Sequence, residues 1–177
     1  MIRSGTAALL LVNLLLSNAT FAAEPGSAGR SDCNVTGTAT DAVEIQQVME
    51  AYHHAVVTHD GSRLAALFIP EGATWLKVLS QSAYARAKAG SAAASKVRPG
   101  SYQEFAKFVS GSKQSLDPKH SNVRIQSDGA IAAVYFDFVF LIDGKEENRG
   151  SESWQLVKGD DGWRIASITY SANPREP

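Results

Sequence analysis

The sequence predicts an α+β domain in which N-terminal helices pack across a curved antiparallel sheet. Two patterns indicate this fold class. Over residues 41–68, apolar side chains recur every three or four positions, which places them on one face of a helix. From residue 120 onward, apolar and polar residues alternate in segments separated by Gly-containing turns, as they do in antiparallel strands.

The chain begins with the three parts of a secretory signal peptide. Arg3 precedes the apolar run "AALLLVNLLL", and the small residues of "TFAAEP" follow it. The apolar run is too short to span a bilayer. We expect residues 1–23 to be removed on export to the periplasm or the medium, with no stable membrane insertion afterwards.

Residues 24–40 are predicted to be a flexible lead-in, because they are rich in Gly, Ser and Thr and lack apolar periodicity. They include Cys33, the only cysteine of the chain, so an internal disulfide is excluded. The roughly 155 residues left after export suit one domain. We assign this domain to residues 41–172 and a short tail to residues 173–177.

The helical region is predicted to contain two helices that meet near Asp60. Asp41 is the expected N-cap of the first helix, and Glu44 completes its capping box. Asp60 is the expected N-cap of the second helix, which Pro70 ends. The apolar face of the first helix consists of Ile45, Val48, Met49, Tyr52, Ala55 and Val56.

Three histidines, His53, His54 and His59, lie close together without the spacing of a metal site. Two histidines bind one metal from a helix when they are three or four positions apart, whereas His59 follows His54 by five. The sequence also lacks a Gly-rich phosphate loop, so neither a metal nor a cofactor is predicted. The formal net charge of −1, with acidic and basic residues interspersed, gives no indication of nucleic-acid binding.

Beyond the helices, a strand is predicted over residues 73–79 and a short aromatic helix over residues 101–111. The intervening Ala- and Ser-rich residues 80–100 suit either a loose helix or an excursion over a pocket mouth. Hairpin signals occur at Asp128-Gly129 and Asp143-Gly144. They help to delimit four strands, over residues 120–126, 131–142, 151–158 and 163–170.

The turn at Asp143-Gly144 predicts which side chains share a face of the sheet. A two-residue turn there places Tyr135 opposite Glu152, Asp137 opposite Gly150 and Ala133 opposite Trp154. Since strand side chains alternate between faces, all of these would point the same way. Polar and aromatic residues would then converge on one side of the sheet.

A two-residue turn at Asp128-Gly129 would add His120, Asn122 and Arg124 to that face, with His120 opposite Asp137. A bulge at this turn would instead send His120 outward. The polar residues could also be solvated edge-strand side chains or a structural salt bridge.

Four stretches cover most of residues 41–170: "AYHHAVVTHDGSRLAALFIPEGATW", "GSYQEFAKFVSG", "NVRIQSDGAIAAVYFDFVF" and "SWQLVKGDDGWRIASITY". In these stretches and in the order of elements, the chain resembles the nuclear transport factor 2-like superfamily, whose cone-shaped fold encloses a pocket between helices and a curved sheet. The last stretch is similar to the SnoaL-like and lumazine-binding-type branches. The resemblance implies a fold more specifically than a function, because the superfamily includes isomerases, dehydratases, cyclases and non-enzymes.

Comparison with the ketosteroid isomerase branch implies roles for individual residues. Tyr52 matches the tyrosine of that branch's oxyanion hole, and Glu152 falls at or near its protonated acid. In that branch the catalytic base is an acidic residue on the first strand. Lys77 or a neighbour occupies the matching position in this sequence. This departure argues against steroid-type isomerisation and leaves hydrogen-bond donors in the pocket without a matching base.

Two functions follow as hypotheses. The first is a non-catalytic exported domain that holds a small ring-containing molecule in its pocket. The second is a lyase, isomerase or cyclase in which His120, oriented by an ionised Asp137, transfers a proton, while Tyr52 and a protonated Glu152 polarise a carbonyl. We favour the first, because no catalytic motif is complete. The predicted ligand-binding residues are Tyr52, Trp75, Phe105, Tyr135, Glu152 and Trp154.

A homodimer built sheet to sheet is also predicted. In the expected register, an apolar stripe of Val134, Phe136, Phe138 and Phe140 faces away from the pocket, and a stripe of this size is rarely left exposed on a soluble monomer. Polar contacts would come from the next strand, through Arg149, Ser151, Ser153 and Gln155.

Overall fold

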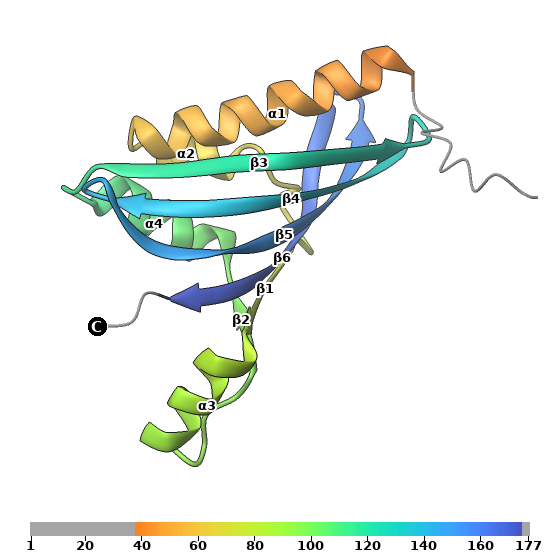
Figure 1. Cartoon of the computed structure of the whole chain (residues 1–177). Coiled ribbons are helices and arrows are strands. Elements are labelled where there is room, and N and C mark those ends of the chain that lie inside the picture. Colours follow the sequence, from red (N-terminus) through yellow and green to blue (C-terminus); the bar gives the residue numbers. More distant parts are fainter. Residues whose placement is uncertain (1–37, 175–177) are drawn as a thin grey trace, which may run out of the picture. The chain divides into compact units, whose positions relative to one another are not determined.

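Helices pack against one curved, unclosed sheet in the structure, a computed structural model that describes residues 38–174 (Figure 1). The predicted signal peptide, nearly all of the lead-in with Cys33, and the last three residues lie outside the described residues. The helices are α1 (Ala39–Val57), α2 (Gly61–Ala65), α3 (Gln81–Gly90) and α4 (Tyr102–Gly111). The strands are β1 (Thr74–Leu79), β2 (Val97–Gly100), β3 (Leu116–Ser127), β4 (Ile131–Ile142), β5 (Lys145–Gly159) and β6 (Gly162–Pro174).

The six strands form a mixed sheet in the order β2-β1-β6-β5-β4-β3. The three pairs among β3, β4, β5 and β6 are antiparallel, as predicted. The pair of β1 and β2 is also antiparallel, but β1 runs parallel to β6. The fold class is therefore confirmed, with one parallel pairing that the sequence did not predict. Since β6 is the last strand, this pairing ties the first strand to the C-terminal end of the domain.

The first helix buries the predicted apolar face but begins earlier than predicted. Thr38 is the N-cap, because its hydroxyl accepts a hydrogen bond from the Asp41 backbone N–H at 3.2 Å. Asp41 accepts in return from the Thr38 backbone N–H, so it completes the capping box from the third helical position. The prediction of Asp41 as N-cap was wrong, whereas Ile45, Met49 and Tyr52 are buried as expected.

The second helix and the fourth helix fit closely together. The Asp60 carboxylate accepts a hydrogen bond from the Arg63 backbone N–H at 2.8 Å, which confirms the predicted N-cap. The next residue, Gly61, is buried, and its backbone N–H donates to the Ser110 hydroxyl on α4 at 3.1 Å. This contact fixes the position of α4, the helix that carries Phe105 and Phe108.

Residues 80–100, whose structure the sequence left open, form α3 and the edge strand β2. A small apolar cluster of Leu79, Ala83 and Ala172 attaches α3 to the sheet. Figure 1 shows α3 projecting away from the other helices at the end of the sheet where β1 and β2 lie. The projection extends the edge of the sheet that β2 forms next to β1.

A bulge in β5 changes the register predicted for β4 and β5. The turn at Asp143-Gly144 is as expected, with Ile142 opposite Lys145, but the register shifts between Phe140 and Leu141. Leu141 pairs with Glu146 and Phe140 with Asn148, so Glu147 is an extra residue in β5.

Because the side-chain period of a strand is two, this single extra residue reverses the predicted pairing. Phe136 lies opposite Glu152, Val134 opposite Trp154, and Asp137 opposite Ser151. The predicted pairs of Tyr135 with Glu152, Asp137 with Gly150 and Ala133 with Trp154 were wrong. Glu152 and Trp154 therefore share a face with the phenylalanines, and Tyr135 and Asp137 lie on the opposite face.

The β3–β4 hairpin also differs from the prediction, at its tip and at a second irregularity. Asp128 pairs with Ile131 through a backbone hydrogen bond, which moves the tip to Gly129-Ala130. The register then shifts between Ser121 and Arg124, where Asn122 has a positive φ of 53°. His120 lies opposite Phe138, not opposite Asp137 as predicted. Beyond the irregularity, Arg124 lies opposite Tyr135 on the other face of the sheet.

These registers remove the surface on which the predicted homodimer was based. Val134 and Phe136 are fully buried and Phe138 is 7% exposed, so the apolar stripe packs inside the domain rather than against a second copy. The reason is the bulge at Glu147, which turns this stripe toward the helices. The homodimer stays a prediction, without the support of this stripe.

The contact between α2 and α4 predicts an effect of adding one methyl group at Gly61. A Cβ built there would collide with the Ala106 carbonyl oxygen and the Ser110 hydroxyl. We expect Gly61→Ala to lower the free energy of unfolding by about 1–3 kcal/mol, as overpacking does, in urea denaturation. Gly90→Ala is the control, because its Cβ would meet nothing within 4 Å. Equal stability of the two variants would contradict this packing.

Candidate ligand-binding pocket

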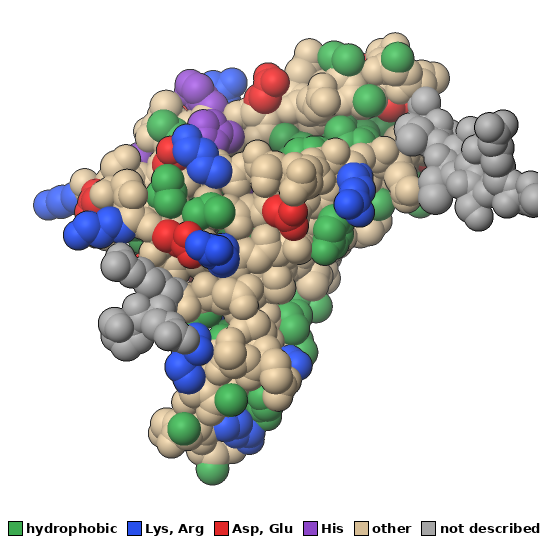
Figure 2. Space-filling model, viewed as in Figure 1, with side chains coloured by type: hydrophobic (Ala, Val, Ile, Leu, Met, Phe, Trp, Pro, Cys, Tyr) green, Lys and Arg blue, Asp and Glu red, His purple; other side chains and the backbone are tan. Residues whose placement is uncertain are grey.

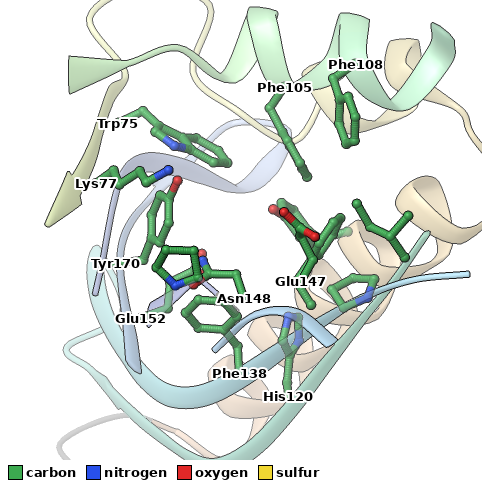
Figure 3. A pocket seen from close by; sticks show the side chains of 15 residues that line it. Trp75, Lys77, Phe105, Phe108, His120, Phe138, Glu147, Asn148, Glu152 and Tyr170 are labelled. Atoms are coloured by element: carbon green, nitrogen blue, oxygen red, sulfur yellow. The ribbon is translucent and has the colours of Figure 1, made fainter. Parts of the chain in front are cut away.

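A cavity of about 340 Å³ lies between the sheet, α1 and α4 (Figure 3). Its volume falls within the range of small-molecule sites. Of the predicted ligand-binding residues, Tyr52, Trp75, Phe105 and Glu152 line this cavity. The other lining residues are Lys77, Phe108, Pro118, His120, Phe138, Phe140, Ile142, Glu147, Asn148, Tyr170 and Pro174.

Aromatic rings form most of the cavity wall. The Phe105 ring stacks on Tyr52 with 6.2 Å between centroids, and it lies 5.3 Å from the Trp75 ring. Trp75 also meets the edge of Tyr170 at 6.1 Å. The indole of Trp75 packs over Gly100, where a built Cβ would lie 2.8 Å from the ring. The wall therefore combines side chains of α1, α4, β1 and β6.

Glu152 is the buried acid of the cavity. It is 9% exposed, and its carboxylate accepts a hydrogen bond from the Trp154 indole N–H at 2.5 Å. Burial raises the pKa of Glu152 to about 7, although the Trp154 hydrogen bond acts in the opposite direction. Glu152 is thus divided between its neutral and ionised forms near neutral pH. Trp154 itself is fully buried behind it and does not line the cavity.

Two tyrosine hydroxyls accompany this acid. Burial raises the pKa of Tyr52 well above its ordinary value, and Glu152 and Tyr170 add to the effect. Burial also raises the pKa of Tyr170, which lies directly across from Glu152 on β6, although the neighbouring Trp75 indole acts in the opposite direction. Within residues 38–174 the Tyr52 hydroxyl makes no hydrogen bond. It is available to a ligand as a neutral donor.

His120 lines the cavity from β3 and is neutral at pH 7. Its ring packs 4.6 Å from Phe136 and 6.2 Å from Tyr52. Burial, together with a smaller effect of the neighbouring His53, lowers the pKa of His120 to about 4. The side chain can therefore accept or donate a hydrogen bond in the cavity, but it carries no charge there.

Asp137 and Tyr135 do not line the cavity, contrary to the prediction. Asp137 accepts hydrogen bonds from the Asn122 amide at 2.8 Å and the Ser151 hydroxyl at 2.9 Å. Those two bonds, the Asn122 one first, lower the pKa of Asp137. Tyr135 is 47% exposed. The predicted His120–Asp137 pair is therefore absent, because the register of β3 and β4, with its shift between Ser121 and Arg124, places His120 opposite Phe138 and on the other face of the sheet from Asp137.

The side chains of His53 and His59 each have a hydrogen-bond partner within the domain. The His53 Nε2 atom lies 3.1 Å from an Asp117 carboxylate oxygen, and the His59 Nδ1 atom lies 2.9 Å from the Ser112 carbonyl oxygen. Over residues 38–174, no three His, Cys, Asp or Glu side chains are grouped as metal ligands would be. In the same part of the chain, every helix is too short or too polar to cross a bilayer.

Comparison with solved structures identifies the fold. An NTF2-like protein of unknown function from Shewanella baltica is 18% identical, with a TM-score of 0.57 over 78% of this chain and 98% of that one. A cystatin-like protein of unknown function from Nostoc punctiforme is 14% identical, with a TM-score of 0.57 over 79% and 96%. A proposed dehydratase of the NTF2-like family from Streptomyces avermitilis is 15% identical, with a TM-score of 0.57 over 77% and 98%.

The protein therefore has the nuclear transport factor 2-like, or cystatin-like, fold that the sequence resemblance implied. No family model matches the sequence, and no curated protein matches it at a significant level. The structural neighbours are too distant in sequence to transfer a function. The assignment to the SnoaL-like or lumazine-binding-type branch stays a prediction.

Glu152 and His120 are predicted to change the stability of the domain with pH in opposite directions. Because its pKa is raised from 4.5 to about 7, folded Glu152 keeps a proton that the unfolded chain loses, so its contribution falls as pH rises between those values. The pKa of His120 is lowered from 6.5 to about 4, so its contribution to the free energy of unfolding rises as pH rises between about 4 and 6.5.

Single variants should separate these two contributions, which largely offset each other between pH 4.5 and 6.5. Relative to the unmodified protein, Glu152→Gln should become more stable with rising pH, by up to about 1.4 kcal/mol per pH unit, and His120→Gln should become less stable. Urea denaturation over this pH range measures both slopes. Parallel profiles for all three proteins would contradict the burial of these groups.

Proposed function

We propose that this domain binds a small, partly apolar molecule in its pocket without transforming it. The observation that carries the proposal is the aromatic-walled cavity of about 340 Å³, whose lining also includes polar groups such as Glu152 and His120. Apolar walls supply affinity for a ring, and a few positioned polar groups orient it. The leader-like N-terminus supports export to the periplasm or the medium as part of the same proposal.

The polar groups suit a ligand with a carbonyl or hydroxyl oxygen. Tyr52 offers a neutral hydroxyl donor, and Glu152 offers a second donor in its protonated form. A buried hydrogen bond to either group contributes about 1 kcal/mol to binding. Because these donors lie within a wall of rings, they would select for a ring that carries such an oxygen.

The support for a role without catalysis comes from His120. The hypothesis of a catalytic pair required Asp137 to orient this histidine, and Asp137 lies on the opposite face of the sheet. Within residues 38–174, no carboxylate makes a hydrogen bond to His120. The histidine thus lacks the partner that would fix its tautomer and stabilise an imidazolium.

A proton-transfer enzyme is the second candidate, favoured by one observation. The pKa of His120 is lowered to about 4 while that of Glu152 is raised to about 7, and opposite shifts of this kind occur in acid-base pairs. A ligand recovered from the protein decides between the two. Incubated in D₂O with the unmodified protein, it would gain deuterium under the enzyme hypothesis, and His120→Gln would stop the exchange. Binding alone leaves its mass unchanged.

Binding in the cavity can be measured with N-phenyl-1-naphthylamine, a neutral probe whose fluorescence rises in apolar surroundings. Phe105→Ala should weaken probe binding about tenfold or more, because truncating a buried phenylalanine removes about 1.5–3 kcal/mol of apolar burial. Tyr135→Ala is the matched control, since it removes an exposed ring on the opposite face of the sheet. Equal effects of the two variants, or no effect of either, would refute binding in this pocket.

A further inference from the structure

Lys77 is a cation in the pocket wall without an acidic partner. It lies on β1 two positions from Trp75, half-buried, and lines the cavity. Figure 3 shows its side chain beside those of Trp75 and Tyr170. Within residues 38–174, Lys77 forms no ion pair and no hydrogen bond. A half-buried ammonium group without a counter-charge is costly, and such groups are usually paired.

A second cation lies next to Lys77 across the sheet. Arg98 on β2 is its direct partner in the β1–β2 register, so both side chains leave the same face. Among residues 38–174, the Arg98 guanidinium donates only to the Ser95 carbonyl oxygen, at 3.2 Å. Like charges directly opposite in a sheet destabilise it. An anion placed between Lys77 and Arg98 would reverse that effect.

The surroundings of this pair are basic. Residues 72–103 contain no Asp or Glu and five basic residues. Figure 2 shows Lys and Arg side chains, and no acidic ones, on the visible face of the projection that α3 and β2 form. A concentration of one sign of charge on one part of the surface attracts ligands of the opposite sign. These basic residues therefore favour an anionic ligand, as Lys77 does.

The acids of the pocket do not neutralise Lys77. The pKa of Glu152 responds to burial and to the Trp154 hydrogen bond, with no cation among its causes. Glu147 also lines the cavity, as the bulged residue of β5, and it forms no ion pair with Lys77. Because both acids stand in the same cavity, they would repel a doubly charged ligand more than a singly charged one.

We propose that Lys77, with Arg98 beside it, binds the carboxylate of a small ring-containing acid whose ring lies against Trp75 and Phe105. This inference rests on the proposed function, because it names the ligand class of the same pocket. The ammonium group donates charge-assisted hydrogen bonds to the carboxylate, and the aromatic wall takes the apolar part. Tyr52 and protonated Glu152 remain available for an oxygen elsewhere on the ring.

Three compounds that share a naphthalene ring and differ in its polar group test this assignment by displacing N-phenyl-1-naphthylamine. They are 2-naphthoate, its neutral isostere 2-naphthamide, and 2-naphthyl phosphate. The unmodified protein should bind 2-naphthoate about tenfold more tightly than 2-naphthamide, as one charge-assisted hydrogen bond implies. It should also bind 2-naphthoate more tightly than the phosphate. Preference for the phosphate would overturn the carboxylate assignment, and equal binding of 2-naphthoate and 2-naphthamide would overturn the anion site.

Variants of Lys77 connect the preference to this residue. Lys77→Met should remove the preference for 2-naphthoate while leaving 2-naphthamide binding within about twofold, and Lys77→Arg should retain most of it because the charge remains. Lys113→Met, at an exposed position after α4, is the control and should change nothing. A preference that persists in Lys77→Met would contradict the proposal.

The two proposals fail in different ways. If Phe105→Ala leaves binding of the N-phenyl-1-naphthylamine probe unchanged, the pocket itself is wrong and both proposals fall. If that variant weakens binding of the probe but the three compounds bind equally, only the proposal of a carboxylate site at Lys77 is refuted.

Discussion

The bulge at Glu147 determines which side chains of the sheet meet the helices. One extra residue in β5 turns Glu152 and Trp154 inward together with Phe136 and Phe138, and it turns Asp137 outward. In an unbulged hairpin, Phe136 and Phe138 would lie on the opposite face of the sheet from Glu152 and Trp154. The burial of these four side chains on one face therefore depends on this local irregularity, and so does the composition of the pocket.

The same bulge buries one acid, Glu152, and burial changes the pKa of this acid. A carboxyl group inside an aromatic cavity costs free energy when ionised, and the raised pKa of Glu152 expresses that cost. The Trp154 indole offsets part of it through a hydrogen bond. His120 bears the corresponding penalty on its protonated form. The cavity thus favours the neutral forms of Glu152 and His120, which suits recognition of a polar ring by hydrogen bonds, while Lys77 supplies a cation to its lining.

Periodicity in the sequence was enough to predict the fold. The apolar spacing of α1, the Asp60 cap and the alternating strands each report a local preference that the tertiary structure also satisfies, so they agree with the elements observed. The start of α1 was misplaced, because Thr38 lies in a segment without apolar periodicity. Its hydroxyl, three residues before Asp41, was the signal that could have located the cap.

The pocket was predicted only in part, for a physical reason. Tyr52, Trp75 and Phe105 were correctly placed because they depend on a helix face or on a strand outside the hairpins. Tyr135 and Asp137 were misplaced because their positions depend on the count of residues through a hairpin. A bulge changes this count without requiring a distinctive residue: Glu147 carries no such signal. Asn122 carries a weak one, since asparagine tolerates its positive φ better than most residues.

Tyr170 and Lys77 were not among the predicted ligand-binding residues, although both line the cavity. They face each other across the parallel β1–β6 pairing, which brings together strands distant in sequence and has no local signature. The cationic end of the pocket was therefore found only in the structure, whereas most of the aromatic wall was predicted from the sequence.

The central claim is that Glu152, and not Asp137, is the buried acid of the pocket. Carboxyl-carbon NMR titration of the intact protein tests it most directly, because it reports each acid separately. The structure predicts a pKa near 7 for Glu152 and a pKa below the ordinary value for Asp137. A Glu152 carboxyl that titrates near 4.5, with Asp137 titrating at the higher pH, would contradict the register and the pocket built on it.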